Sequence, residues 1–359
     1  RRRHPRLPTR SRGLGDVYKR QGMGRGAVPT EPPPPGVVRI DTGVYDPILG
    51  RSYAQVGSEA RSMHRCQSMS QLQGLPGGRA SQWLLEEAVI ETGDREGDLF
   101  DGVETGLDRF KDFVAGEEAQ AGFFLEGLEA LKGHVARAEE AFDALEPWNT
   151  LPALRDGLAT VRQLRADISA SSLSGDAKYD LEHRLSVKEE QFANAVALAH
   201  GVALEPIAAE GEVVPGEEFN VDLLVVNPSP EPINVTSIEV VTPDGWTQGT
   251  ERGETSGTIS AGEGLASAFG LRVADDAKYS RPYWERLPDV DRFDFLEREL
   301  LRIPFAPAPV QAWVTFRYGD IEVVMEEPVH DRYEGAWVGS EKKHRVTVLP
   351  DLSVNVSPG

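Results

Sequence analysis

The sequence predicts a multidomain α+β protein in which an antiparallel helical bundle precedes an immunoglobulin-like β-sandwich. The chain has 359 residues, which exceeds the usual length of a domain built around a single hydrophobic core. Apolar residues recur every three or four positions between about 96 and 200, and after Gly201 they alternate with polar ones. Turns rich in Pro and Gly then separate about seven short strands, a pattern typical of immunoglobulin-like domains.

The helical region is assigned to residues 96–203. Each apolar stripe has a charged opposite face, which is typical of an antiparallel bundle with short loops. We interpret the charges as a solvated surface. Pro147 ends the second helix, Asp176 is a candidate cap for the fourth, and Gly201 closes it. The four expected stripes lie within residues 99–114, 124–142, 154–168 and 181–198.

The sandwich is assigned to residues 204–359. Its first clear strand alternates Phe219, Val221, Leu223 and Val225 with polar residues or Leu224. Residues 279–307 are too long for a hairpin loop and are interpreted as an insertion with a short helix at 293–301. The other expected strands lie at 233–240, 257–261, 267–273, 309–318, 320–326 and 344–356.

The N-terminal part is assigned in two pieces. Residues 1–20 hold eight basic side chains against Asp16 alone, so they could form a nucleic-acid or membrane tail or the start of a signal peptide. We prefer a third reading, because residues 11–21 look like translated adapter sequence, and we expect residues 1–21 to lie outside the fold. Residues 22–95 follow as a separate piece, with a loop at 22–36, a strand at 37–40 and a helix at 52–71.

Composition narrows the classes of function. A formal net charge of −20 argues against a nucleic-acid partner, since such binding requires clustered Lys and Arg. No apolar run is long enough for a transmembrane segment. Cys66 is the only cysteine, so an intrachain disulfide and a cysteine zinc site are both excluded. No two histidines have the spacing of a helical metal pair, and no nucleophile elbow or P-loop occurs.

One polar cluster stands apart from these patterns. On a continuous helix, Arg61, His64 and Arg65 would share one face, and Gln67 could join it. A plain interpretation is a polar helix face turned to solvent. The alternative is a pocket wall whose cationic and amide donors bind sugar hydroxyls, a carboxylate or a phosphate. The candidate residues for the pocket edge are Arg51, Tyr53, Arg61, His64 and Gln67.

The same stretch carries a family resemblance. Residues 41–53, with Gly50-Arg51-Ser52-Tyr53, and residues 61–67, with Arg-Ser-Met-His-Arg-Cys-Gln, resemble the end of the deacetylase domain in large bacterial PIG-L (LmbE-like) proteins. Large members continue into a helical region and then a sandwich, the order seen here. The sandwich is similar to a small domain appended to some α-galactosidases, with its marks at residues 227–228, 243–246 and 281–284.

The resemblance implies the C-terminal portion of a zinc-dependent N-deacetylase. Residues 22–95 would be the C-terminal edge of its α/β deacetylase domain. The family's metal motifs would lie upstream, so zinc is implied for the parent enzyme and for no residue of this chain. The implied substrates are N-acetylated sugars or glycans, and the implied location of the full-length form is secreted or periplasmic.

A second hypothesis is a non-enzymatic module that binds carbohydrate or a protein partner. Exposed aromatic side chains would support it, although packing in the core is the commoner fate of Trp in a sandwich. Trp313 faces away from Val310, Ala312, Val314 and Phe316, but one strand cannot tell which face is buried. The candidate aromatic residues are Trp246, Tyr283, Trp284, Trp313 and Trp337.

Overall fold

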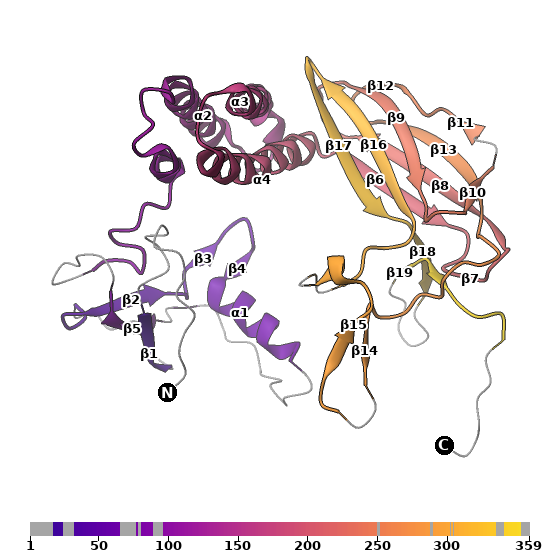
Figure 1. Ribbon diagram of the computed structural model, residues 1–359, viewed down its shortest axis with the longest axis horizontal. Helices are drawn as coiled ribbons and strands as arrows, with labels where there is room; N and C mark the ends of the chain where they lie inside the picture. Colours follow the sequence, from indigo (N-terminus) through magenta and orange to yellow (C-terminus); the bar gives the residue numbers. More distant parts are fainter. Residues whose placement is uncertain are drawn as a thin grey trace. The chain divides into compact units, whose positions relative to one another are not determined.

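The protein has an α+β fold that divides into two compact units, Arg1–Gly116 and Glu117–Gly359 (Figure 1). The computed structural model describes residues 17–23, 32–64, 77, 80–88, 96–249, 252–287, 290–301, 303, 305–334 and 341–352. Within those residues, no helix is long and apolar enough to cross a membrane.

The first unit contains a three-stranded antiparallel sheet in the order β1–β5–β2. Its strands are β1 (Val17–Met23), β5 (Ala80–Glu87) and β2 (Val37–Asp41). The strand at 37–40 is therefore confirmed, whereas β5 was not foreseen. Residues 17–21 also differ from expectation, because they belong to β1. An edge strand is held by backbone hydrogen bonds and needs no apolar alternation, so charge and periodicity gave no sign of it. Residues 1–16 lie outside the described residues.

A small hairpin and a short helix follow β2. Strands β3 (Tyr45–Asp46) and β4 (Arg51–Ser52) pair with each other, and α1 (Tyr53–Ser62) begins directly after them. The helix expected over 52–71 thus ends at Ser62, and residues 65–71 lie outside the described residues.

The first expected helix of the bundle is not an α-helix. Residues 96–106 form turns, and only a 3-10 helix, η2 (Leu107–Val114), follows. Gly102 has a φ of 77°, a left-handed conformation that interrupts an α-helix. The apolar spacing still serves burial, because Phe110 and Val114 are buried.

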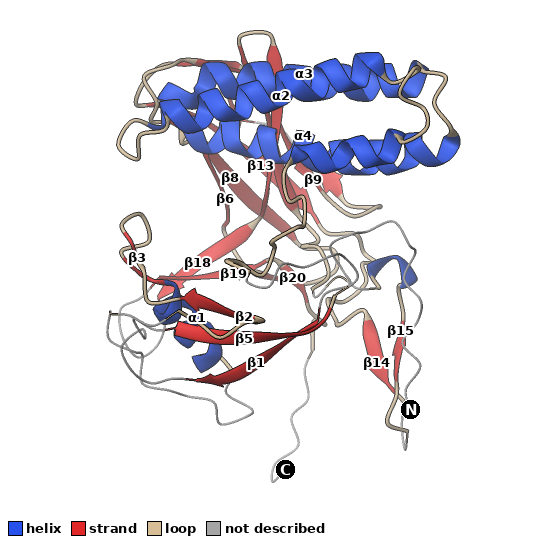
Figure 2. Ribbon diagram, turned by 90° about the vertical axis from the view of Figure 1, so that its left-hand side faces the viewer, coloured by secondary structure: helices blue, strands red, loops and turns tan. Residues whose placement is uncertain are grey.

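The remaining three helices form the bundle (Figure 2). They are α2 (Gly122–Ala141), α3 (Leu151–Ala170), preceded by the 3-10 turn η3 (Pro147–Thr150), and α4 (Gly175–His200). Most of each predicted apolar stripe is buried, and Leu128, Leu158 and Leu185 are fully enclosed. The stripes are wrong at two ends, because Phe142 follows the end of α2 and is 52% exposed, and Leu198 of α4 is 77% exposed. The cap of α4 is Ser174, whose Oγ accepts the amide of Ala177 at 3.3 Å, in place of the Asp176 expected from the sequence.

Two sheets form the C-terminal region. One has seven strands in the order β10–β13–β8–β6–β18–β19, with β11 also paired to β13, and the other has four in the order β12–β9–β16–β17. Strands β20 (Thr347–Val348) and β7 (Glu212–Val213) form a small parallel pair. The seven-stranded sheet contains β6 (Ala203–Ala208), β8 (Glu218–Asn227), β10 (Thr247–Gln248), β11 (Arg252–Gly253), β13 (Glu263–Arg272), β18 (His330–Glu334) and β19 (Glu341–Arg345). The four-stranded sheet contains β9 (Ile233–Val241), β12 (Gly257–Ile259), β16 (Gln311–Tyr318) and β17 (Ile321–Pro328).

Period-two alternation is confirmed in both sheets. Residues 219, 221, 223 and 225 of β8 are buried, and so are 312, 314 and 316 of β16. Trp313 therefore stands on the outer face, 38% exposed, which settles the face that the sequence left open.

The insertion at 279–307 differs in its secondary structure. Strands β14 (Trp284–Arg286) and β15 (Phe293–Phe295) form a hairpin, and a 3-10 turn η4 (Arg298–Leu300) follows. The helix expected at 293–301 is wrong at its start. Phe293 and Phe295 lie on one face of a strand, with the period-two spacing typical of β-structure. In a segment of nine residues, this spacing cannot be distinguished from the spacing of apolar residues in a helix.

Candidate functional site

The site predicted from the sequence lies in the first unit, around the β3–β4 hairpin. The Asp46 carboxylate organises its turn, because Oδ1 accepts the amides of Ile48 at 2.9 Å and Leu49 at 3.0 Å. The amide of Gly50 donates to the Asp46 carbonyl at 2.9 Å, and Gly50 has a φ of 67°. A glycine at this left-handed position lets the chain turn back into β4.

Tyr53 is bound to the same carboxylate. Its hydroxyl donates to Asp46 Oδ2 at 3.0 Å. The amide of Leu49 and the Tyr53 hydroxyl both lower the pKa of Asp46, because they stabilise the ionised carboxylate. The same bond, with the nearby negative charge, raises the pKa of Tyr53. Tyr53 therefore stays a neutral phenol at physiological pH.

The start of α1 fixes the direction of Arg51 and Tyr53. Ser52 is buried at the N-cap, and the side chain of Gln55 accepts its amide at 2.9 Å, forming a capping box. The amide of Ala54 donates to the Thr42 carbonyl at 2.7 Å, which ties the helix to the preceding loop. Arg51 forms an ion pair with Glu59 along the helix. The sequence run Gly-Arg-Ser-Tyr thus encodes a turn, a cap and two oriented polar side chains.

The helical face drawn through Arg61 and His64 does not form. The helix ends at Ser62, and His64 follows it, with its amide bonded to the Arg61 carbonyl at 3.1 Å. Arg65 and Gln67 lie outside the described residues. The structure therefore brings Arg51 and Tyr53 together at the hairpin, while His64 follows the far end of the same helix.

An exposed apolar surface accompanies these polar groups. Helix α1 buries none of its residues completely. We call the seven large apolar side chains exposed on this segment the 44–63 surface; they are Val44, Tyr45, Ile48, Leu49, Tyr53, Val56 and Met63. A large share of exposed apolar side chains in one short segment favours an interaction site there.

The described residues do not supply a metal centre. Among them, no group of three or more His, Cys, Asp or Glu side chains could hold a metal ion. A catalytic zinc needs about three protein ligands converging on one point. The family resemblance implies zinc for the parent enzyme and for no residue of this chain, so no step through a metal is assigned to this chain.

A second exposed surface lies on the insertion, where the sequence named Tyr283 and Trp284 as candidates. Tyr283 stacks on Phe295 at 5.9 Å between ring centroids, and Trp284 meets the edge of Phe293 at 5.0 Å. Trp284 is 41% exposed and Phe293 49%. We call these four rings the hairpin surface. The two phenylalanines were missed because their segment was expected to be helical.

The other aromatic candidates have different roles. Trp246 packs edge-to-face on Phe219, at 6.2 Å between centroids, and is part-buried. Trp313 stands exposed on β16, and Trp337 lies outside the described residues.

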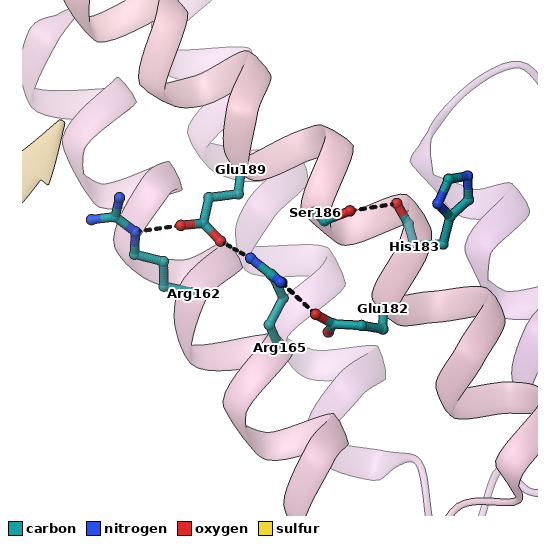
Figure 3. A network of polar contacts seen from close by, with 6 residues as sticks. All are labelled: Arg162, Arg165, Glu182, His183, Ser186 and Glu189. Carbon is teal, nitrogen blue, oxygen red and sulfur yellow. Dashed lines mark hydrogen bonds and ion pairs between the residues drawn. The ribbon is translucent and has the colours of Figure 1, made fainter. Parts of the chain in front are cut away.

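Helices α3 and α4 also share a charged network, shown in Figure 3. Arg162 Nε donates to Glu189 Oε1 at 2.7 Å, and Arg165 bonds to both Glu189 and Glu182. Burial raises the pKa of Glu189, but the two arginines outweigh it, so the net shift is downward. Arg165 also lines an open cavity of about 530 Å³ with Lys178. Because these charges are already paired between α3 and α4, we interpret the network as a structural contact that holds the two helices together.

Comparisons with known proteins do not assign a family. No family model matches the chain, and no curated protein matches it. Among solved structures, the sporulation control protein Spo0M from Bacillus subtilis is 12% identical with a TM-score of 0.21, over 36% of this chain and 48% of that one. The secreted serine protease VesC from Vibrio cholerae is 8% identical with a TM-score of 0.24, over 40% and 26%. A FixG-related protein from Vibrio parahaemolyticus is 13% identical with a TM-score of 0.19, over 35% and 93%. At these scores the likeness carries no argument about fold or function.

Proposed function

We propose that this chain is the C-terminal portion of a zinc-dependent N-deacetylase similar to PIG-L proteins, acting on N-acetylated sugars or glycans outside the cytoplasm. The observation that carries the proposal is the 44–63 surface. Its hairpin and helix are oriented by a capping box, an aspartate turn and an ion pair, yet they expose seven large apolar side chains. A segment with a defined backbone and many exposed apolar side chains is suited to be one wall of a larger domain.

The domain identities follow from the same proposal. Residues 22–95 are the C-terminal edge of an α/β deacetylase domain, and residues 96–203 form a spacer of helices. Residues 204–359 are an immunoglobulin-like sandwich, supported by the two sheets, whose strand pairs are antiparallel except for β6–β18, and by their alternating burial. In this arrangement the catalytic zinc belongs to the upstream half of the enzyme.

The residues of this chain have binding roles in the proposal. Arg51 is a fixed cation able to donate to sugar hydroxyls or a carboxylate. Tyr53 is a neutral phenol whose hydrogen is donated to Asp46, so its oxygen can accept a hydrogen bond from a sugar hydroxyl while Asp46 holds the hydroxyl in place. Arg61, His64 and Gln67 complete the candidate edge. Their task is to orient the substrate, and the chemistry is left to the metal-bearing half.

The test requires the longer protein. Genomic DNA upstream of codon 22 is expected to encode, in frame, a His-Pro-Asp-Asp motif. In the enzyme expressed from that reading frame, Arg51→Ala is expected to lower kcat/KM for an N-acetylglucosamine conjugate by about 10- to 100-fold, the scale for losing one positioned charge. Tyr179→Phe, an exposed tyrosine on α4, is the matched control for a remote surface change. An upstream frame without the motif, or full activity in Arg51→Ala, contradicts the proposal.

A second candidate function is a carbohydrate- or partner-binding module without catalysis. The hairpin surface favours it, because two paired sets of rings project from a two-stranded ribbon. Planar aromatic rings offer apolar faces to sugar rings or to protein side chains. Glycan-array binding by this chain, lost in Trp284→Ala and kept in Trp313→Ala, would support this function. Equal binding by both variants, or no binding by the wild type, would exclude it for the hairpin.

A further inference from the structure

A buried imidazole lies where the end of the bundle meets the two sheets. His200 is the last residue of α4, and Gly201, with a φ of 68°, turns the chain into β6. The His200 side chain is 1% exposed by residue surface. Its ring meets the edges of two aromatic rings of β16, at 6.1 Å from Phe316 and 4.8 Å from Tyr318.

One polar group contacts this imidazole. Nδ1 lies 3.3 Å from Ser229 Oγ, in the buried turn between β8 and β9. That hydroxyl donates to the Glu231 carbonyl at 3.2 Å and accepts the Glu231 amide at 2.9 Å. Because the hydroxyl hydrogen is engaged there, we assign Nδ1 as the donor to Ser229, which leaves the lone pair on Nε2. Nε2 is buried and has no hydrogen-bond partner among the described residues.

The surrounding turn is rigid. The Asn227 side-chain amide donates to the Glu231 carbonyl at 2.8 Å and to the Ile259 carbonyl at 3.1 Å. A Cβ built on Gly201 would stand 2.9 Å from Pro228 Cγ, so the helix end and the turn are in close contact. A ring held between β16 and this turn has little room to move toward a new acceptor.

We propose that His200 is a pH-sensitive lock between the bundle and the two sheets. Neutral, it holds α4 against β16 and the β8–β9 turn; protonated, it releases them. The proton would add at Nε2, which is buried without a partner among the described residues and so would gain an N–H without an acceptor. A cation at the C-terminus of a helix is normally favoured, but here burial outweighs it and lowers the pKa of His200 to about 4.

The charged groups around the joint do not compensate this cation. From α3, Arg155 pairs with Asp156 at 2.7 Å, and both act on Tyr318. Burial raises the pKa of Tyr318, and Glu231 and Asp156 raise it further, so its phenol stays neutral. Asp320, in the turn after β16, acts on Arg155. Burial is the cause of the lowered pKa of His200, so desolvation controls the lock.

The direction of the pH effect follows from linkage. In an opened joint the imidazole reaches water and has an ordinary pKa of 6.5. Between pH 6.5 and about 4, His200 is protonated in the open form and neutral in the closed form. Each pH unit of acidification in this window therefore shifts the equilibrium about tenfold toward the open form. Above pH 6.5 the lock is insensitive to pH.

The test measures the joint in the whole chain. Spin labels are placed at exposed positions on either side, Tyr179→Cys on α4 and Val324→Cys on β17, in a Cys66→Ser background. Distance distributions are recorded from pH 7.5 to 4.5, with circular dichroism in parallel to follow secondary structure. We expect one narrow distribution at pH 7.5 and progressive broadening below pH 6.5 while the helical signal is retained. Broadening that coincides with loss of the helical signal, or no broadening at pH 4.5, overturns the proposal.

Variants separate the lock from general acid sensitivity. His200→Phe keeps an aromatic ring but cannot be protonated, so its distribution is expected to stay narrow across the range. His183→Phe changes an exposed histidine on the same helix and is expected to behave as the wild type. Should His200→Phe fail to fold, an NMR titration of the wild-type His200 imidazole decides the question. An imidazole pKa near 6.5 in the closed protein overturns the proposal, and one near 4 supports it.

Discussion

The bundle and the two surface hairpins are both shaped by local hydrogen bonds and packing, but the bundle buries its apolar side chains and the hairpins leave theirs exposed. Helices α2, α3 and α4 place their apolar stripes against one another and enclose Leu128, Leu158 and Leu185 fully. The β3–β4 hairpin with α1, and the β14–β15 hairpin, are equally defined by hydrogen bonds and ring contacts but leave their apolar side chains exposed. Hydrogen bonds and caps therefore define the local shape of both regions, whereas only the bundle gains the stability that apolar burial supplies.

The largest expected effect compares one residue type in the two environments. Phe124 is fully buried in α2, and Phe305, within the insertion and beyond its hairpin, is 76% exposed. Phe124→Ala is expected to lower the free energy of unfolding by about 3–5 kcal/mol, because it leaves a cavity as well as losing apolar burial. Phe305→Ala is expected to change it by less than about 0.5 kcal/mol. Urea unfolding followed by circular dichroism measures both, and equal losses would contradict the division drawn here.

A smaller effect tests how tightly the bundle is packed. A Cβ added to Gly157 of α3 would stand 2.3 Å from the Phe192 ring of α4. Gly157→Ala is therefore expected to destabilise the protein by about 1–3 kcal/mol through overpacking. At Gly133 of α2 the nearest atom to a new Cβ is the flexible end of Arg137, at 3.5 Å. Gly133→Ala is expected to stabilise by about 0.5–1 kcal/mol, as alanine does inside a helix. The expected result is a lower thermal midpoint for Gly157→Ala and a higher one for Gly133→Ala, each compared with the wild type.

The hairpin surface is expected to contribute little to stability. Trp284→Ala removes one ring of an edge-to-face pair that is half in solvent. The expected loss is about 0.5–1 kcal/mol, the range for such a pair beyond area burial. Because β14–β15 is a two-stranded ribbon, the loss should appear as faster amide exchange confined to residues 283–296. A global loss of several kcal/mol would place the hairpin inside the core after all.

The smallest effect concerns the bond between Asp46 and Tyr53. The hydrogen bond lowers the pKa of Asp46, so its contribution to stability is present above the ordinary aspartate range and is lost as pH falls through the folded value. It raises the pKa of Tyr53, so that contribution is lost as pH rises above 10. Asp46→Asn is expected to return the pKa of Tyr53 toward 10, as measured by ultraviolet titration of its phenol. An unchanged titration would mean that the hydroxyl does not bond to Asp46 in solution.

Some of this protein could be predicted from its sequence. The three long helices and the alternating strands were predicted because each obeys a local period that burial enforces along the whole element, as in β8 and β16. The Gly-Arg-Ser-Tyr run was identified as a candidate site, and its turn and cap are local features of five or six residues.

The failures share a physical cause. Strand β1 is an edge strand held by backbone hydrogen bonds to β5, and such a strand needs no side-chain pattern by which the sequence could predict it. The segment after Leu99 has helical spacing but also Gly102 and Gly106, and it forms only a 3-10 turn. The spacing of apolar residues predicts which side chains are buried. It does not predict the backbone conformation that buries them.

The sequence by itself determined which residues are apolar at which spacing, and hence the α+β class, the bundle and the alternating sheets. Tertiary structure alone decided which polar groups are enclosed. His200 has no sequence signal that separates it from the exposed His183 on the same helix, yet one lies against Phe316 and Tyr318 and the other in solvent. A side chain's local periodicity is set by its neighbours in sequence, but its solvation, and therefore its protonation, is set by residues over a hundred positions away.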